Sequence, residues 1–110
     1  SAGLMLSLGI VDELTPDDLT NGFNVSGTGT INYLGQVGPI GGIRQKLEGA
    51  VAGGSNLFLA PKENCDEVLS KNYKNMPVVA VTDLKGAIEA INTFTKQENA
   101  AGLPNCEISK

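Results

Sequence analysis

Apolar spacing and capping residues predict four helices, over residues 2–14, 43–52, 64–73 and 84–94. The first, AGLMLSLGIVDEL, is apolar nearly all the way round, and Leu4, Leu8 and Val11 share one of its faces. A helix that is apolar on every side is typical of a protein interior. We therefore expect this helix to be buried.

Three segments have the pattern of strands, residues 23–33, 56–60 and 77–81. Apolar and polar residues alternate in the first, with Val25, Ile31 and Tyr33 in phase on the apolar side. Gly27 and Gly29 fall on that same side, where a missing side chain allows a bend or the close approach of another backbone. The other two segments are short and apolar, and helices alternate with them. This order predicts an α/β fold with parallel strands.

Composition limits the function as well as the fold. A chain of 110 residues, 41% of them hydrophobic, is the size of one domain with one core. A net charge of -4 and the lack of a basic run interleaved with aromatic residues argue against nucleic acid as a partner. The chain contains no histidine, which excludes the Ser-His-Asp triad, the Cys-His pair and histidine-based metal sites. We expect no metal and no cofactor, and any nucleophile must use another base.

The stretch GQVGPIGGIRQK, residues 35–46, contains four glycines and a proline directly before two cations. On a helix that begins near Ile43, Arg44 and Lys46 flank opposite borders of the apolar face. Arginine stays protonated in proteins, whereas a lysine at an apolar surface can lose its proton and act as a general base. A serine paired with a lysine base performs acyl transfer without histidine. The alternative is that Lys46 is only a solvated side chain at the edge of an amphipathic helix.

Four segments resemble, in order and spacing, the C-terminal two thirds of a Lon-type protease domain. They are SAGL at 1–4, GTGTI at 27–31, GQVGPIGGIRQKLEGA at 35–50 and FLAPKEN at 58–64. The resemblance implies the α/β (α+β) Lon protease fold without its N-terminal strands. It also implies a catalytic dyad of Ser1 and Lys46, with Thr28 as the supporting residue of the site. The family's frequent acidic residue two positions after this threonine is Thr30 here.

The resemblance implies a serine endopeptidase that hydrolyses peptide bonds through an acyl-enzyme, with peptides or unfolded proteins as substrates. We expect it to be independent of ATP, because the sequence has no phosphate-loop motif. Two alternatives remain open. One is a binding or assembly module that retains the fold without catalysis, and the other uses the amine of Ser1 as the base. Because the sequence starts at the nucleophile, we expect residues 1–110 to be one C-terminal fragment of the protease domain, with a tail from about residue 97.

The two cysteines, Cys65 and Cys106, are predicted to form a disulfide, since the bond would tether an otherwise polar tail. Two free thiols, or a reactive Cys65 at a helix start, are the alternatives. A disulfide indicates an oxidising compartment. With this disulfide and the lysine motif GPIGGIRQK, the sequence resembles the membrane-anchored, ATPase-free PDZ–Lon-like peptidases of Gram-positive bacteria. That resemblance implies a protein outside the cytoplasm, held at the membrane by a segment outside this sequence. It is compatible with homo-oligomers. A cytoplasmic location is the alternative.

Overall fold

The computed structural model describes residues 2–15, 18–68, 73 and 76–106. Its elements along the chain are α1 (Gly3–Leu14), β1 (Val25–Gly27), β2 (Thr30–Ile31), β3 (Val37–Gly38), α2 (Ile43–Ala52), β4 (Leu57–Pro61), the 3-10 helix η1 (Lys62–Asn64), α3 (Cys65–Val68), β5 (Val78–Val81) and α4 (Leu84–Gln97). The fold is mixed α/β, as the sequence predicts.

The central sheet has three parallel strands in the order β1-β4-β5. Every residue of β4 is buried, because this strand is central and is covered on both faces. Parallel pairing of β4 and β5 is what the alternation of strands and helices predicts. The carboxyl ends of all three strands therefore lie at one end of the sheet.

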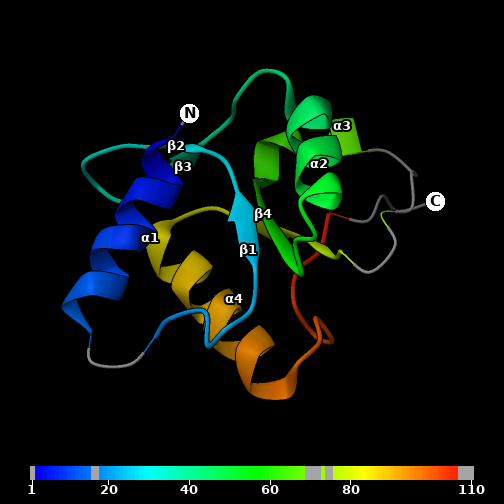
Figure 1. Ribbon diagram of the computed structural model, residues 1–110. Coiled ribbons are helices and arrows are strands. Elements are labelled where there is room, and N and C mark those ends of the chain that lie inside the picture. Colours follow the sequence, from blue (N-terminus) through cyan, green and yellow to red (C-terminus); the bar gives the residue numbers. More distant parts are fainter. Residues whose placement is uncertain (1, 16–17, 69–72, 74–75, 107–110) are drawn as a thin grey trace.

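Helices cover both faces of this sheet (Figure 1), and each face has its own apolar cluster. On one face α1 and α4 pack against alternate strand residues, among them Leu57 and Leu59. On the other face α2 and α3 pack against the intervening residues, among them Phe58 and Ala60. The period of two along β4 therefore divides the core into two halves.

The predicted strand over residues 23–33 is two strands in the structure. β1 belongs to the parallel sheet, whereas β2 pairs antiparallel with β3 in a separate two-stranded sheet. The chain bends between them at Gly29, which has a φ of 152°. Tyr33, expected on the apolar side, is 95% exposed, because β2 ends at Ile31 and the alternation does not extend beyond it.

Helix α1 is correctly predicted in position, but its burial is not as expected. Leu4 and Leu8 are buried in the core, whereas Leu6, Ile10 and Leu14 are 66%, 62% and 80% exposed. The helix packs on the sheet with one face only, and its outer face carries these three side chains. None of the described helices is long and apolar enough to cross a lipid bilayer.

Helix α4 begins at Leu84, as predicted, and the side chain of the preceding Asp83 caps it by accepting a hydrogen bond from the N–H of Gly86 at 2.6 Å. The third predicted helix, over residues 64–73, is described only as α3, and residues 69–72 lie outside the described part of the chain. After α4, the tail turns back towards the sheet (Figure 1). It makes an isolated antiparallel bridge to β5 between Asn105 and Val79. This pairing was not predicted from the sequence.

Candidate active site

The start of α1 lies against the bend that follows β1. The N–H of Leu4 donates to the carbonyl oxygen of Gly29 at 3.0 Å, and a side chain on Gly3 would meet Ile31 at 3.1 Å. Ser1 itself is outside the described residues. Its neighbours in sequence therefore lie at the carboxyl end of β1, and the Ser1–Lys46 dyad stays a prediction.

Thr28 occupies the same end of the sheet. It follows β1 directly, it is only 2% exposed, and its N–H donates to the carbonyl oxygen of Leu59 at 3.1 Å. Strand alternation places its side chain on the same face as Ser26, whose hydroxyl contacts that of Ser55 just after α2. Thr28 therefore faces the layer of the molecule that contains α2.

The approach of α1 to β1 depends on a glycine. A Cβ on Gly27 would lie 2.9 Å from the carbonyl oxygen of Leu59 and 3.1 Å from the sulfur of Met5. The Met5 side chain is flexible and could move, but the carbonyl oxygen of Leu59 cannot, because it belongs to the backbone of the central strand. Gly27 therefore lets α1 pack closely over the strand that leads to Thr28.

Lys46 is an exposed residue of α2, four positions after the glycine that precedes the helix. On the opposite flank, the guanidinium of Arg44 donates through Nε to the carbonyl oxygen of Glu67 at 3.1 Å, in α3. Residues two apart on a helix are separated by about 200° around its axis. Because Arg44 faces α3 on the β5 side of the sheet, Lys46 faces the opposite side, where β1 lies.

The position of Lys46 along the strand direction follows from the way α2 leads into β4. In a right-handed crossover the helix runs opposite to the strand that it precedes, so the first turns of α2 lie near the carboxyl ends of β1 and β4. Lys46, Thr28 and the start of α1 are therefore gathered at one end of the sheet.

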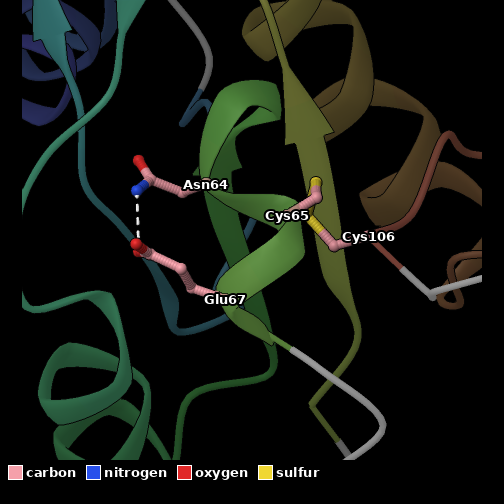
Figure 2. The surroundings of a disulfide bond; sticks show 4 residues. All are labelled: Asn64, Cys65, Glu67 and Cys106. Atoms are coloured by element: carbon pink, nitrogen blue, oxygen red, sulfur yellow. Dashed lines mark hydrogen bonds between the residues drawn. A yellow bond between two sulfur atoms is a disulfide. The ribbon is translucent and has the colours of Figure 1, made fainter.

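Asn64 is a residue of this region that the sequence prediction did not assign to the site. Its side chain is 3% exposed and holds both backbone groups of Ile40: Oδ1 accepts from the N–H at 2.9 Å, and Nδ2 donates to the carbonyl oxygen at 2.9 Å. Nδ2 also donates to the Glu67 carboxylate at 3.1 Å (Figure 2). Asn64 therefore fixes the glycine-rich turn immediately before α2. The sequence pattern identifies Asn64 only as the first residue of the helix predicted over residues 64–73.

The turn ends at Gly42, which has a φ of 72° and occupies the N-cap of α2. This left-handed conformation is accessible to glycine at little cost. Together with the hold of Asn64 on Ile40, it sets the direction in which α2 starts, and hence where Lys46 lies. The glycines of residues 35–42 are thus explained in part by the backbone conformation of this turn, since Gly35 and Gly42 both have positive φ angles.

Cys65 and Cys106 are bonded to each other in the structure, with an S–S distance of 2.09 Å, and neither cysteine is free. The bond joins the start of α3 to the tail beside β5 (Figure 2). The pairing is the one expected from the sequence. It lies on the far side of the sheet from β1.

The described residues contain no group of three Cys, Asp or Glu side chains that could hold a metal ion. The groups considered at the carboxyl end of β1 are the Thr28 hydroxyl, the Lys46 amine and the backbone N–H groups at the start of α1. These are the groups that a serine–lysine acyl transfer requires.

Residues 1–93 match the Lon protease (S16) C-terminal proteolytic domain. The chain belongs to the Lon protease family. The mixed α/β architecture with a parallel sheet agrees with that assignment, which confirms the predicted fold class. The match supports a peptidase.

Three Lon proteases illustrate the relationship. The chain is 34% identical to "Lon protease" of Brucella abortus over 118 aligned residues, which cover 97% of the chain and 14% of that protein. It is 31% identical to "Archaeal Lon protease" of Archaeoglobus fulgidus over 78 residues, 69% of the chain and 13% of that protein. With "Lon protease 2" of Herpetosiphon aurantiacus it is 38% identical over 84 residues, 74% of the chain and 10% of that protein. The matched region is thus a small part of each relative.

Proposed function

We propose that this chain carries the nucleophile and the base of a serine endopeptidase, with Ser1 and Lys46 as a catalytic dyad and Thr28 as the residue that supports it. The observation that carries the proposal is the convergence of three features at one end of the sheet: the start of α1, the buried Thr28 and the flank of α2 that bears Lys46. Membership of the Lon family supports it as well.

In the proposed mechanism, Lys46 in its neutral form accepts the hydroxyl proton of Ser1 as the oxygen attacks a peptide carbonyl. The proton then passes from Lys46 to the leaving amine as the C–N bond breaks, which leaves an ester on Ser1. Water attacks this ester with Lys46 again as the base, and the acid product leaves. Each proton that Lys46 accepts is returned within one turnover.

The first turn of α1 supplies donors for the oxyanion that forms during this attack. Backbone N–H groups at the start of a helix have no partner within the helix and stabilise negative charge there. The N–H of Leu4 already donates to Gly29. We therefore assign the oxyanion contact to the N–H groups of Ala2 and Gly3, which lie closer to Ser1 in the sequence.

We further propose that the intact protein works outside the cytoplasm, on peptides or unfolded proteins, and without ATP. The disulfide between Cys65 and Cys106 supports this location, because such bonds persist in oxidising compartments. ATP is scarce there, so hydrolysis is expected not to depend on it. A membrane anchor, a PDZ domain and assembly into homo-oligomers belong to the same proposal, by analogy with the ATPase-free Lon-like peptidases.

The test is hydrolysis of fluorescein-labelled casein by the protein and by two matched variants of α2, without nucleotide and then with ATP. Lys46→Arg keeps the positive charge but removes the base, so kcat/KM should fall by about 10³-fold or more while the fold is retained. Arg44→Lys is the control, and its activity should stay within about threefold. Near-normal turnover by Lys46→Arg contradicts the dyad. A rate that requires ATP contradicts ATP independence alone.

A further inference from the structure

The chain passes from α1 to β1 through a surface turn (Figure 1) that the proposed mechanism does not use. Residues 19–22 form this turn, in which Asn21 has a φ of 49° and Gly22 a φ of 85°. Both residues are exposed. Among the ten asparagines of the sequence, Asn21 is the one that precedes a glycine, so it differs from the others in the reaction open to it.

The reactivity of an asparagine depends on the residue that follows it. The backbone nitrogen of that residue can attack the side-chain carbon Cγ, which closes a succinimide ring. A side chain on the attacking residue obstructs this approach, and glycine has none. A Cβ on Gly22 would meet no described atom within 4 Å, and within the described part of the chain no hydrogen bond engages the carboxamide of Asn21. The Asn21 carboxamide is therefore free to turn towards the nitrogen of Gly22.

Other exposed asparagines lack this combination. Asn24 precedes a valine, and its Nδ2 donates to the carbonyl oxygen of Gly53 at 3.1 Å. Asn99 precedes an alanine, and its Oδ1 accepts from the N–H of Ala101 at 2.9 Å. In both residues the carboxamide is held away from the reaction and the next side chain obstructs it. Asn21 is therefore expected to react much faster than either of them.

The fold places a carboxylate where it slows the reaction at Asn21. The N–H of Gly22 donates to Oδ2 of Asp18 at 3.3 Å. The nitrogen attacks only after it loses this proton, and a carboxylate beside it opposes the negative charge that would form. The bond is long and its residues are exposed, so it opens without disturbing the core. Asp18 therefore slows the attack and does not prevent it.

We propose that Asn21 is a site of spontaneous modification by water, with Asp18 controlling its rate. The nitrogen of Gly22 bonds to Cγ of Asn21, the Cγ–Nδ2 bond breaks, and ammonia leaves with the proton of the Gly22 nitrogen. Water then opens the succinimide at either carbonyl carbon. Attack at Cγ gives aspartate, whereas attack at the main-chain carbon gives isoaspartate, in which the chain runs through the former side chain. No oxidant or reductant takes part.

The two products differ in their effect on the turn. Isoaspartate adds one atom to the main chain between Leu19 and Phe23, both of which pack against the core. The ring of Phe23 also contacts that of Phe94 edge-on, with 5.2 Å between their centroids. Because both sides of the turn are anchored, the extra atom should destabilise the isoaspartate form. Aspartate keeps the length of the turn and adds only a negative charge.

The experiment is incubation of the protein in mildly alkaline buffer, followed by chymotryptic digestion and mass spectrometry of the resulting peptides. Asn21 should be converted at least about tenfold faster than Asn24 in the same sample, which makes Asn24 the internal control. Methylation by an isoaspartyl methyltransferase identifies the isoaspartate fraction. Conversion of Asn21 no faster than that of Asn24 overturns the proposal.

Two variants test the role of the carboxylate. Asp18→Ala should speed conversion of Asn21 by about threefold or more. Asp66→Ala, at an exposed position of α3, is the matched control and should leave the rate unchanged. Circular dichroism checks that both variants are folded. Equal rates in Asp18→Ala and the unmodified protein contradict control by Asp18. Lys46→Arg should also leave the rate unchanged, which keeps this test independent of the peptidase assay.

A last measurement tests the effect on the fold. The isoaspartate fraction is separated by ion exchange, and its urea midpoint is compared with that of Asn21→Asp, which reproduces the other product. The isoaspartate form should unfold at a lower urea concentration, whereas Asn21→Asp should unfold close to the unmodified protein. Equal midpoints for the two forms would contradict the anchoring of the turn at Leu19 and Phe23.

Discussion

The two edges of the central sheet end in different ways. At the β1 edge the chain bends at Gly29 directly after the buried Thr28, and the start of α1 packs on that bend. At the β5 edge the tail adds two hydrogen bonds, and a disulfide fixes it to α3. Glycines and polar groups determine the path of the chain at the β1 edge, whereas the Cys65–Cys106 disulfide holds the tail at the β5 edge.

The two edges therefore differ in the role that we propose for them. The groups proposed for catalysis lie near β1, where backbone turns position them, whereas the covalent constraint lies near β5 and stabilises the chain. Asn64 and Cys65 are adjacent in the sequence and connect the two regions: Asn64 holds the turn before α2, and Cys65 holds the tail. Substitutions at the two edges should therefore affect stability and turnover to different degrees.

The largest expected change in stability comes from the β5 edge. Replacing both Cys65 and Cys106 by serine removes a cross-link between residues 41 positions apart, which should lower the free energy of unfolding by roughly 4 kcal/mol. Turnover at a temperature where the variant is folded should fall less than about threefold, because the hydrogen bonds of Asn64 remain. Urea denaturation and casein hydrolysis measure the two effects. A loss of turnover as large as that expected for Lys46→Arg would show that the edges are not separable.

Asn64→Ala should affect both properties. It removes the three hydrogen bonds of a buried side chain and leaves the backbone of Ile40 without this partner, so the free energy of unfolding should fall by about 3 kcal/mol. Because the turn before α2 then loosens, kcat/KM should also fall by about tenfold to 100-fold. Asn92→Ala, at an exposed position of α4, is the control and should change neither. Normal turnover by Asn64→Ala would show that Asn64 is not needed to position Lys46.

Features that depend on residues close together in the sequence could be predicted, whereas features that depend on contacts between distant residues could not. The helices and the parallel pairing of β4 and β5 follow from local spacing and element order, and so they could be predicted. The exposure of Ile10 could not, since it depends on which face of α1 meets the sheet. The role of Asn64 depends on contact with Ile40, 24 residues away, which no local pattern encodes.

The end of β1 illustrates the same limit within the candidate site. Two glycines in the alternating segment 23–33 allow either a close approach or a bend, and the structure has the close approach at Gly27 and the bend at Gly29. Thr28, between them, was assigned to the site from family resemblance rather than from its own pattern. Its burial depends on packing between distant parts of the chain, such as its hydrogen bond to Leu59 of β4, which a local pattern does not encode.

A smaller effect is expected from the hydroxyl of Thr28. Thr28→Val keeps the shape of this buried side chain and removes the oxygen, so kcat/KM should fall by about 10-fold to 100-fold if the hydroxyl supports Lys46 through a hydrogen bond. Thr28→Ser, which keeps the oxygen, should retain most of the activity. Both are checked by steady-state kinetics together with the denaturation midpoint. Equal rates for Thr28→Val and Thr28→Ser would rule out a role for the hydroxyl.

The smallest effect is expected on the outer face of α1. Ile10→Gln changes a side chain that is 62% exposed, so the free energy of unfolding should change by less than about 0.5 kcal/mol and turnover should stay the same. Leu8→Gln is the contrasting variant, because Leu8 is buried, and it should destabilise the protein by about 3 kcal/mol. Thermal unfolding of the two variants measures the difference. A large loss of stability in Ile10→Gln would mean that this face is covered in solution.

The most direct test of the central claim is the distance between the hydroxyl oxygen of Ser1 and the Nζ atom of Lys46, measured in a crystal structure of the protein with a bound peptide boronate. The dyad predicts a covalent bond between boron and the Ser1 oxygen, with Nζ within about 2.6–3.2 Å of that oxygen. An ordered Ser1 without the adduct, or a Lys46 that projects away from it on the other side of α2, would contradict the proposed mechanism.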